Sequence, residues 1–89
     1  MVKIYKYELQ EGPNEVTAPI IQVLDIQLQG ELPVMWAYVN VDSRLMRTID
    51  IQMLWTGMTV TEDLLREYEY FKTLQDSSGL VWHVFLKGV

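Results

Sequence analysis

Hydrophobic and polar residues alternate along most of the chain, and this two-residue period predicts β-strands. The clearest examples are 3–9 and 49–55, where apolar side chains occupy every second position. Two apolar runs, 20–28 and 34–41, lie between them and are joined by the short connector 29–33. Strands joined by so short a connector are expected to pair as an antiparallel hairpin. We therefore expect the domain to be built around a central hairpin formed by these two runs.

The two arms of this hairpin differ in the polarity of their faces. In the first arm Leu24 and Ile26 alternate with polar residues, which predicts one buried and one solvated face. In the second arm Trp36 and Tyr38 alternate with residues that are also apolar, so this strand is expected to be central or covered on both sides. The pattern predicts a core that includes Leu24, Ile26, Trp36, Ile49, Ile51 and Val84.

Turn residues and one helix signal divide the rest of the chain. Turns are expected at 11–14, 40–43 and 76–79, where Gly, Pro, Asn, Asp and Ser cluster. Thr59 and Glu62 have the spacing of a capping box and precede leucines at helical intervals, which predicts a short helix over about 62–67.

The stretch 68–75 is ambiguous because its apolar residues fit both a strand and a continued helix. We favour a strand that ends at Gln75, followed by a last strand over 80–87. The whole pattern, six or seven short strands with one brief helix, predicts a mainly β fold: a small antiparallel β-sandwich or partly open barrel.

Length and composition limit the architecture to one small domain over 1–89, since a second core could not be housed in 89 residues. The chain has no cysteine, so neither a disulfide nor a thiolate metal site is possible. Packing alone must stabilise it, and three Trp and five Tyr are more aromatic surface than one small core readily hides. We therefore expect a homo-oligomer, a dimer or larger.

The formal net charge of −5 disfavours nucleic acid and anionic membranes as partners, because both require a basic surface. No run of about 18 apolar residues predicts a membrane-spanning segment. Together with the lack of cysteine, this favours a cytoplasmic location.

Three stretches resemble a family of small uncharacterised proteins from phages and prophages: Lys3-Ile4-Tyr5-Lys6-Tyr7-Glu8-Leu9, Leu32-Pro33-Val34-Met35-Trp36-Ala37-Tyr38-Val39 and Val81-Trp82-His83-Val84-Phe85. The chain departs from that family at Met58, where members tend to carry His, and at Lys72, where they tend to carry Gly. None of these motifs is an active-site signature. The resemblance implies a short, host-directed factor, for which counter-defence is a natural role.

Arginine, aromatic and histidine side chains are the candidates for ligand contacts. Arg44 and Arg47 could grip a phosphate with their planar guanidinium groups, or could be solvated loop charges. Trp36, Tyr38 and Trp55 could form a stacking wall for a base, or could pack in the core.

His83 is the only histidine, and no Asp or Glu lies near it in the sequence, so it is either structural or a ligand contact. No metal, cofactor or catalytic residue is predicted. The acidic run 62–69 is expected to be solvated, and the serines lack an activating base at a suitable spacing.

These observations favour a non-enzymatic protein that acts by stoichiometric binding. The expected partner is a small nucleotide-type signal or a host defence protein. The alternative is a minor structural or accessory protein of the virion, and an enzyme is a third class that no motif supports.

Overall fold

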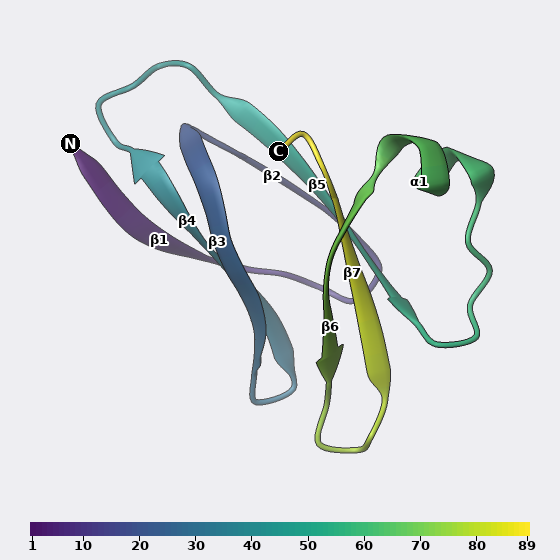
Figure 1. The fold of residues 1–89 in the computed structure, drawn as a ribbon. Coiled ribbons are helices and arrows are strands. Elements are labelled where there is room, and N and C mark those ends of the chain that lie inside the picture. Colours follow the sequence, from purple (N-terminus) through teal and green to yellow (C-terminus); the bar gives the residue numbers. More distant parts are fainter.

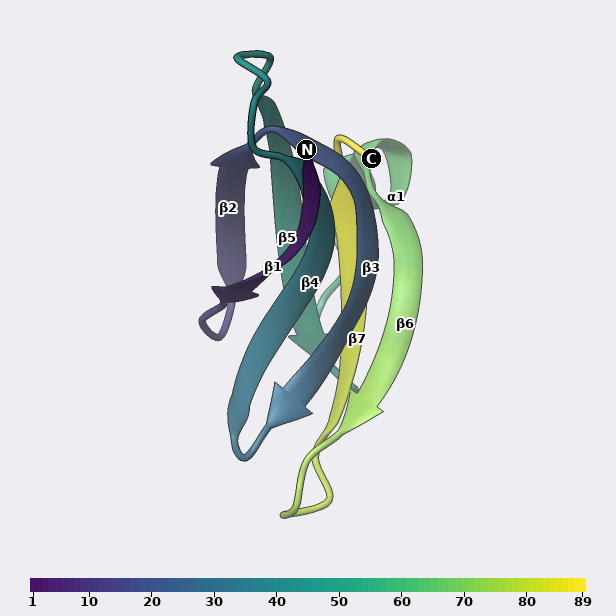
Figure 2. The ribbon, with the colours of Figure 1, turned by 90° about the vertical axis from the view of Figure 1, so that its left-hand side faces the viewer.

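The computed structural model describes residues 1–89 and contains seven strands and one helix (Figure 1). The elements are β1 (Val2–Glu8), β2 (Pro13–Ala18), β3 (Ile20–Gln29), β4 (Leu32–Asn40), β5 (Arg47–Trp55), α1 (Glu62–Glu67), β6 (Glu69–Gln75) and β7 (Val81–Lys87). All strand pairs are antiparallel, and they form a three-stranded sheet of order β1-β4-β3 and a four-stranded sheet of order β2-β5-β7-β6. The two sheets form two layers (Figure 2), so the expected sandwich is confirmed and the barrel is not closed.

The predicted central hairpin is β3 and β4. Gln29 pairs with Leu32, and Gly30 has a φ of 65°, the positive value that a two-residue hairpin connection requires. β4 lies between β1 and β3, as expected for a strand that is apolar on both faces. The hairpin therefore forms the centre and one edge of the smaller sheet.

Two irregularities in β3 change which of its residues face the core. The register with β4 shifts between Ile20 and Gln22 and again between Val23 and Asp25. The buried residues are consequently Ile20, Val23 and Ile26, three positions apart instead of two. Leu24 was expected in the core from strict alternation, but it is only partly buried because it lies at the second irregularity.

The inner face of β4 is the opposite of the predicted one. Met35, Ala37 and Val39 are at most 1% exposed and belong to the core, whereas Trp36 lies on the outer face and is only partly buried. The prediction of Trp36 as a core residue is therefore wrong. Both faces of β4 are apolar, so alternation could not distinguish them. The other predicted core residues, Ile26, Ile49, Ile51 and Val84, are fully buried.

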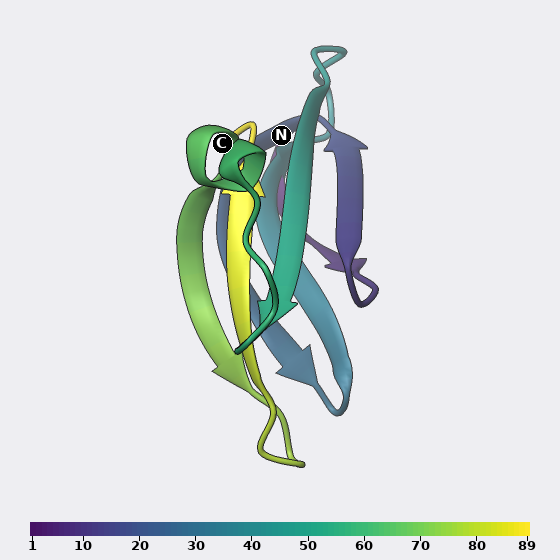
Figure 3. The ribbon, with the colours of Figure 1, turned by 90° about the vertical axis from the view of Figure 1, so that its right-hand side faces the viewer.

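The short helix α1 lies near the start of β6 and the end of β7 (Figure 3). The helix spans the predicted range 62–67, and its N-cap is Thr61, whose Oγ1 accepts a hydrogen bond from the Leu64 amide at 3.1 Å. Thr59, the residue that the capping-box spacing indicated, lies two residues before this cap. The favoured strand over the ambiguous stretch is confirmed as β6. The helix is too short to span a membrane.

Candidate functional site

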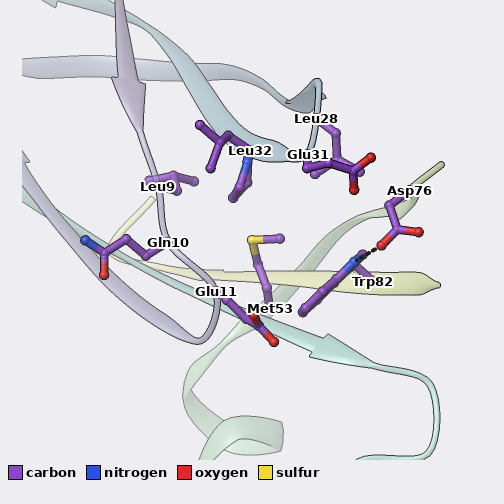
Figure 4. A pocket seen from close by; sticks show the side chains of 10 residues that line it. Leu9, Gln10, Glu11, Leu28, Glu31, Leu32, Met53, Asp76 and Trp82 are labelled. Carbon is purple, nitrogen blue, oxygen red and sulfur yellow. Dashed lines mark hydrogen bonds between the residues drawn. The ribbon is translucent and has the colours of Figure 1, made fainter. Parts of the chain in front are cut away.

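A cavity of about 270 Å³ opens between the two sheets at one end of the sandwich (Figure 4). The turn between β3 and β4, the turn between β6 and β7, and the segment after β1 surround it. Its apolar floor consists of Leu9, Leu28, Met53 and Trp82, and its rim carries the carboxylates of Glu11, Glu31 and Asp76. No basic side chain lines it.

The floor is fixed because its residues belong to the packed core or lie directly against it. Leu9, Met53 and Trp82 are at most 8% exposed, and Leu28 is partly buried against the same cluster. The backbone amide of Leu9 also donates to the Pro33 carbonyl at 2.9 Å, which ties the segment after β1 to the start of β4. The cavity is therefore a preformed feature of the fold.

Asp76 organises the turn between β6 and β7. Its carboxylate accepts hydrogen bonds from the Ser78 hydroxyl at 2.6 Å, from the Ser78 and Leu80 amides at 2.9 Å each, and from Trp82 Nε1 at 3.3 Å. These bonds, the Ser78 hydroxyl first, hold the pKa of Asp76 below its ordinary value. Asp76 is therefore an anion at neutral pH, and it orients the indole of Trp82 in the cavity wall.

The two glutamates of the rim differ in their contacts. Glu31 accepts a hydrogen bond from the Ser77 hydroxyl, which links the two hairpin turns, whereas Glu11 makes no hydrogen bond or ion pair. No group of three or more His, Cys, Asp or Glu side chains lies close enough together to hold a metal ion. An apolar floor below separated carboxylates suits an occupant with an apolar stem and a cationic head.

None of the six sequence-predicted contact residues lines this cavity. The guanidinium of Arg47 donates to the backbone carbonyls of Ile20 at 3.2 Å, Ile21 at 2.9 Å and Gly88 at 2.9 Å. Gly88 has a φ of 93°, and a Cβ there would lie 2.3 Å from the Thr48 carbonyl oxygen, so only glycine fits this approach. Arg47 thus makes structural contacts, while Arg44 is exposed in the loop between β4 and β5.

The predicted aromatic contacts lie on opposite sheets. Trp36 and Tyr38 share the outer face of β4 in the smaller sheet. Trp55 lies at the end of β5 in the larger sheet, where its ring is 5.2 Å from that of Trp82. The structure therefore does not gather these residues with the arginines into one wall, and their role in ligand binding stays a prediction.

His83 lies on the outer face of the larger sheet between two threonine hydroxyls. Its Nε2 is 2.8 Å from Thr56 Oγ1, and its Nδ1 is 3.3 Å from Thr73 Oγ1. No carboxylate contacts the ring. Met58, at the position of the His that the resemblance leads one to expect, accepts a hydrogen bond from the Trp55 amide at its sulfur. These contacts fix the imidazole and the turn after β5.

Sequence reasoning missed the cavity because its acidic residues looked like ordinary turn residues. Glu11, Glu31 and Asp76 are 20 or more positions apart and lie in three different connections. Strict alternation of antiparallel strands places the first and third connections at one end of the sandwich, but it places the sixth connection, between β6 and β7, at the other end. The segment through α1 returns the chain along the sheet, so β5 and β6 are parallel and the sixth connection lies at the same end as the first and third (Figure 1). Alternation along the sequence would therefore not have brought these three carboxylates together.

The comparisons place the chain in a family and give no assigned activity. A family model described as Domain of unknown function (DUF7352) matches residues 1–88. No curated protein matches the chain, and no solved structure matches it. The match spans all seven strands and the cavity described above. The chain therefore belongs to the family described as Domain of unknown function (DUF7352).

Proposed function

We propose that the protein acts by stoichiometric binding to a partner protein, and that the cavity receives a lysine or arginine side chain of that partner. The observation that carries this proposal is the apolar floor beneath an acidic rim. A lysine or arginine stem would contact Leu9, Leu28 and Met53, while its charged head would reach the carboxylates.

The size and charge of the cavity favour a side chain over a nucleotide. Its volume of about 270 Å³ lies just below the roughly 300–1,000 Å³ of pockets that enclose small molecules. A phosphate would also meet the carboxylates of Glu11, Glu31 and Asp76 with no cation to offset them. Of the two expected ligand classes, a protein partner is therefore the better supported.

Exposed apolar side chains beside the cavity suit a protein interface. Leu32 lines the cavity and is 59% exposed, and Leu80, in the turn beside it, is 40% exposed. An interface often combines such apolar contacts with a charged group bound in a central pocket.

The resemblance to phage and prophage proteins supports a more specific form of the proposal. In that form the partner is a host defence protein in the cytoplasm, and the complex blocks its action. The alternative is a minor structural or accessory protein of the virion, in which the same cavity would bind a neighbouring virion protein.

The chemistry of the cavity can be tested with n-pentylammonium, which mimics a lysine side chain. We expect it to shift the Trp82 indole N–H resonance saturably in two-dimensional NMR. The double variant Glu11→Gln with Glu31→Gln should weaken this binding roughly five- to thirty-fold, as the loss of two partly screened charge contacts predicts. The matched control, Glu15→Gln with Glu62→Gln, makes the same change in net charge at exposed positions outside the cavity.

Two results would overturn this assignment. One is equal binding of n-hexanoate, which has a similar stem and the opposite charge. The other is unchanged n-pentylammonium affinity in the Glu11 and Glu31 double variant.

The class of partner can be tested by native mass spectrometry of the protein purified from infected cells. We expect the wild type and the Glu15 and Glu62 control to retain a host protein that the Glu11 and Glu31 double variant loses. This result would support a host defence protein as the partner. Retention of a virion protein with the same dependence supports the alternative, and a retained nucleotide contradicts the choice of a protein partner.

A further inference from the structure

The strand β1 is an open edge of the smaller sheet. The sheet order places β4 on one side of β1 and no strand on the other. β1 pairs with β4 over all seven of its residues, Val2–Glu8, without a register shift. It also contains no proline, so its free side presents a regular row of backbone donors and acceptors.

Two hydrogen bonds at the ends of β1 show which residues present that row. The Leu9 amide donates to the Pro33 carbonyl at 2.9 Å, and the Val41 amide donates to the Met1 carbonyl at 3.0 Å. In an antiparallel pair, hydrogen-bonded residues alternate with residues whose backbone groups point away. The odd-numbered residues of β1 therefore bond to β4, and the backbone groups of Val2, Ile4, Lys6 and Glu8 face outward from the edge.

Three of the six exposed side chains of β1 are large and apolar, and the other three, Lys3, Lys6 and Glu8, are charged. Val2, Ile4 and Tyr5 are 55%, 58% and 42% exposed, respectively. The edge strand β2 of the other sheet differs, because it is one residue shorter and begins with Pro13. A regular edge that has no proline and exposes apolar side chains is a site where another strand adds, provided that its charged side chains meet suitable partners.

We propose that β1 pairs antiparallel with β1 of a second copy, about a two-fold axis that passes beside Tyr5. Such an axis places the even-numbered residues of one copy, whose backbone groups face outward, opposite the even-numbered residues of the other copy. This arrangement is the condition for an antiparallel hydrogen-bonded pair. The two smaller sheets then become one continuous six-stranded sheet. This inference concerns a different surface from the cavity and does not depend on the proposed function.

The charges on β1, together with the number of outward residues that can pair, select the register. An axis beside Lys3 or Lys6 would place that lysine opposite the same lysine of the second copy, which is unfavourable. An axis beside Tyr5 places Ile4 opposite the partner's Lys6 and Val2 opposite the partner's Glu8. All four outward residues then pair, which gives about eight inter-chain hydrogen bonds.

The local charge of β1 also favours contact between copies. Its two lysines and one glutamate give a net charge of +1, whereas the whole chain carries −5. Two copies that meet at β1 therefore avoid most of the repulsion between their acidic surfaces. Ile4 lies opposite Tyr38 of β4, so the new sheet also brings the exposed apolar outer faces of the two copies next to each other.

The mass in solution tests the proposal directly. We expect light scattering at about 100 μM to give twice the chain mass of 10.4 kDa. Ile4→Pro removes an outward N–H without removing a bond to β4, so it should give a folded monomer. Ile4→Thr retains the N–H and the strand preference, and it should remain dimeric. Far-UV circular dichroism confirms that each variant is folded.

A charge pair tests the register independently of backbone hydrogen bonding. Ile4→Lys places a positive charge opposite the partner's Lys6, whereas Ile4→Glu places a negative charge there. We expect the dimer dissociation constant of the lysine variant to exceed that of the glutamate variant roughly ten-fold. Adding Lys6→Glu to Ile4→Lys should restore the dimer.

Three outcomes would overturn the proposal. A wild-type mass of one chain at 100 μM would reject self-association. A folded Ile4→Pro variant that remains dimeric would place the contact elsewhere. Equal dissociation constants for the lysine and glutamate variants would reject the register beside Tyr5.

Discussion

The sandwich has two sides at which an edge strand of one sheet lies near an edge strand of the other, and only one of these sides is closed by contacts between the sheets. On one side, β3 and β6 come into contact, and Lys72 Nζ lies 2.7 Å from Asp25 Oδ1 across the gap between the sheets. Phe71 packs against the core next to this ion pair. On the other side, no hydrogen bond or ion pair joins β1 to β2, and Tyr5 is 42% exposed although it shares a face with the core-packed Tyr7.

This difference shows how a small sandwich can combine stability with an open interaction surface. The closed side uses polar contacts between the sheets, and these fix how the layers lie on each other. The open side keeps one sheet edge and part of an inner face in contact with solvent. We infer that the closed side carries more of the stability, and that the open side is available for a second copy.

The largest expected effect comes from Arg47, which joins the start of β5 to the start of β3 in the other sheet and to the segment after β7. Arg47→Ala leaves the carbonyls of Ile20, Ile21 and Gly88 without their donor and should lower the free energy of unfolding by about 2–3 kcal/mol. Urea denaturation measures this change. Arg44→Ala is the control and should change stability by less than about 0.5 kcal/mol, since Arg44 is an exposed loop residue. Similar losses in the two variants would contradict the structural role of Arg47.

Most of the fold could be predicted because it depends on the two-residue alternation of apolar and polar side chains and on the residue types that form turns. The hairpin of β3 and β4, the strand β5 and the start of α1 all follow from local patterns. Trp36 could not be placed, since both faces of β4 are apolar and only the packing of the second sheet decides between them. Leu24 was misplaced because an irregularity in register leaves no clear sequence signal.

The candidate site could be predicted far less well than the fold. Arg47 has the chemistry of a phosphate ligand, and only the tertiary structure shows that three carbonyls engage it. The cavity arises from residues brought together by topology, such as Met53 from β5 and Glu31 from a hairpin turn. Sequence patterns describe neighbours along the chain, so they do not contain such contacts.

A smaller effect is expected at acidic pH from the ion pair of the closed side. Partial burial acts to raise the pKa of Asp25, but hydrogen bonds from Lys72, Gln27 and the Ile26 amide outweigh it and lower the pKa below the ordinary value. The resulting stability is present above the unfolded pKa of about 3.9 and is lost as the pH falls through the lower folded value.

Asp25→Asn should therefore cost about 0.5–1 kcal/mol at pH 7, a value reduced for the partial exposure of the pair, and this difference should shrink below about pH 4. Denaturation series at pH 3 and pH 7 measure it. Asp50→Asn is the control, because the side chain of Asp50 makes no ion pair or hydrogen bond. A difference from wild type that stays constant from pH 7 to pH 3 would show that Asp25 stabilises the fold by something other than its charge.

The smallest expected effect belongs to the open side and appears at alkaline pH. Burial, and secondarily the nearby Tyr5, raises the pKa of Tyr7 above its ordinary value. A raised folded pKa means that this stability is present below the unfolded pKa of about 10 and is lost as the pH rises through the folded value.

Tyr7→Phe should therefore unfold less readily than wild type above about pH 10, while changing stability by less than about 0.5 kcal/mol at pH 7. Tyr38→Phe, on the outer face, is the control and should follow the wild-type curve. If both phenylalanine variants behave alike above pH 10, Tyr7 is not distinguished by its burial, and the inner face of β1 is more open to solvent than the structure indicates.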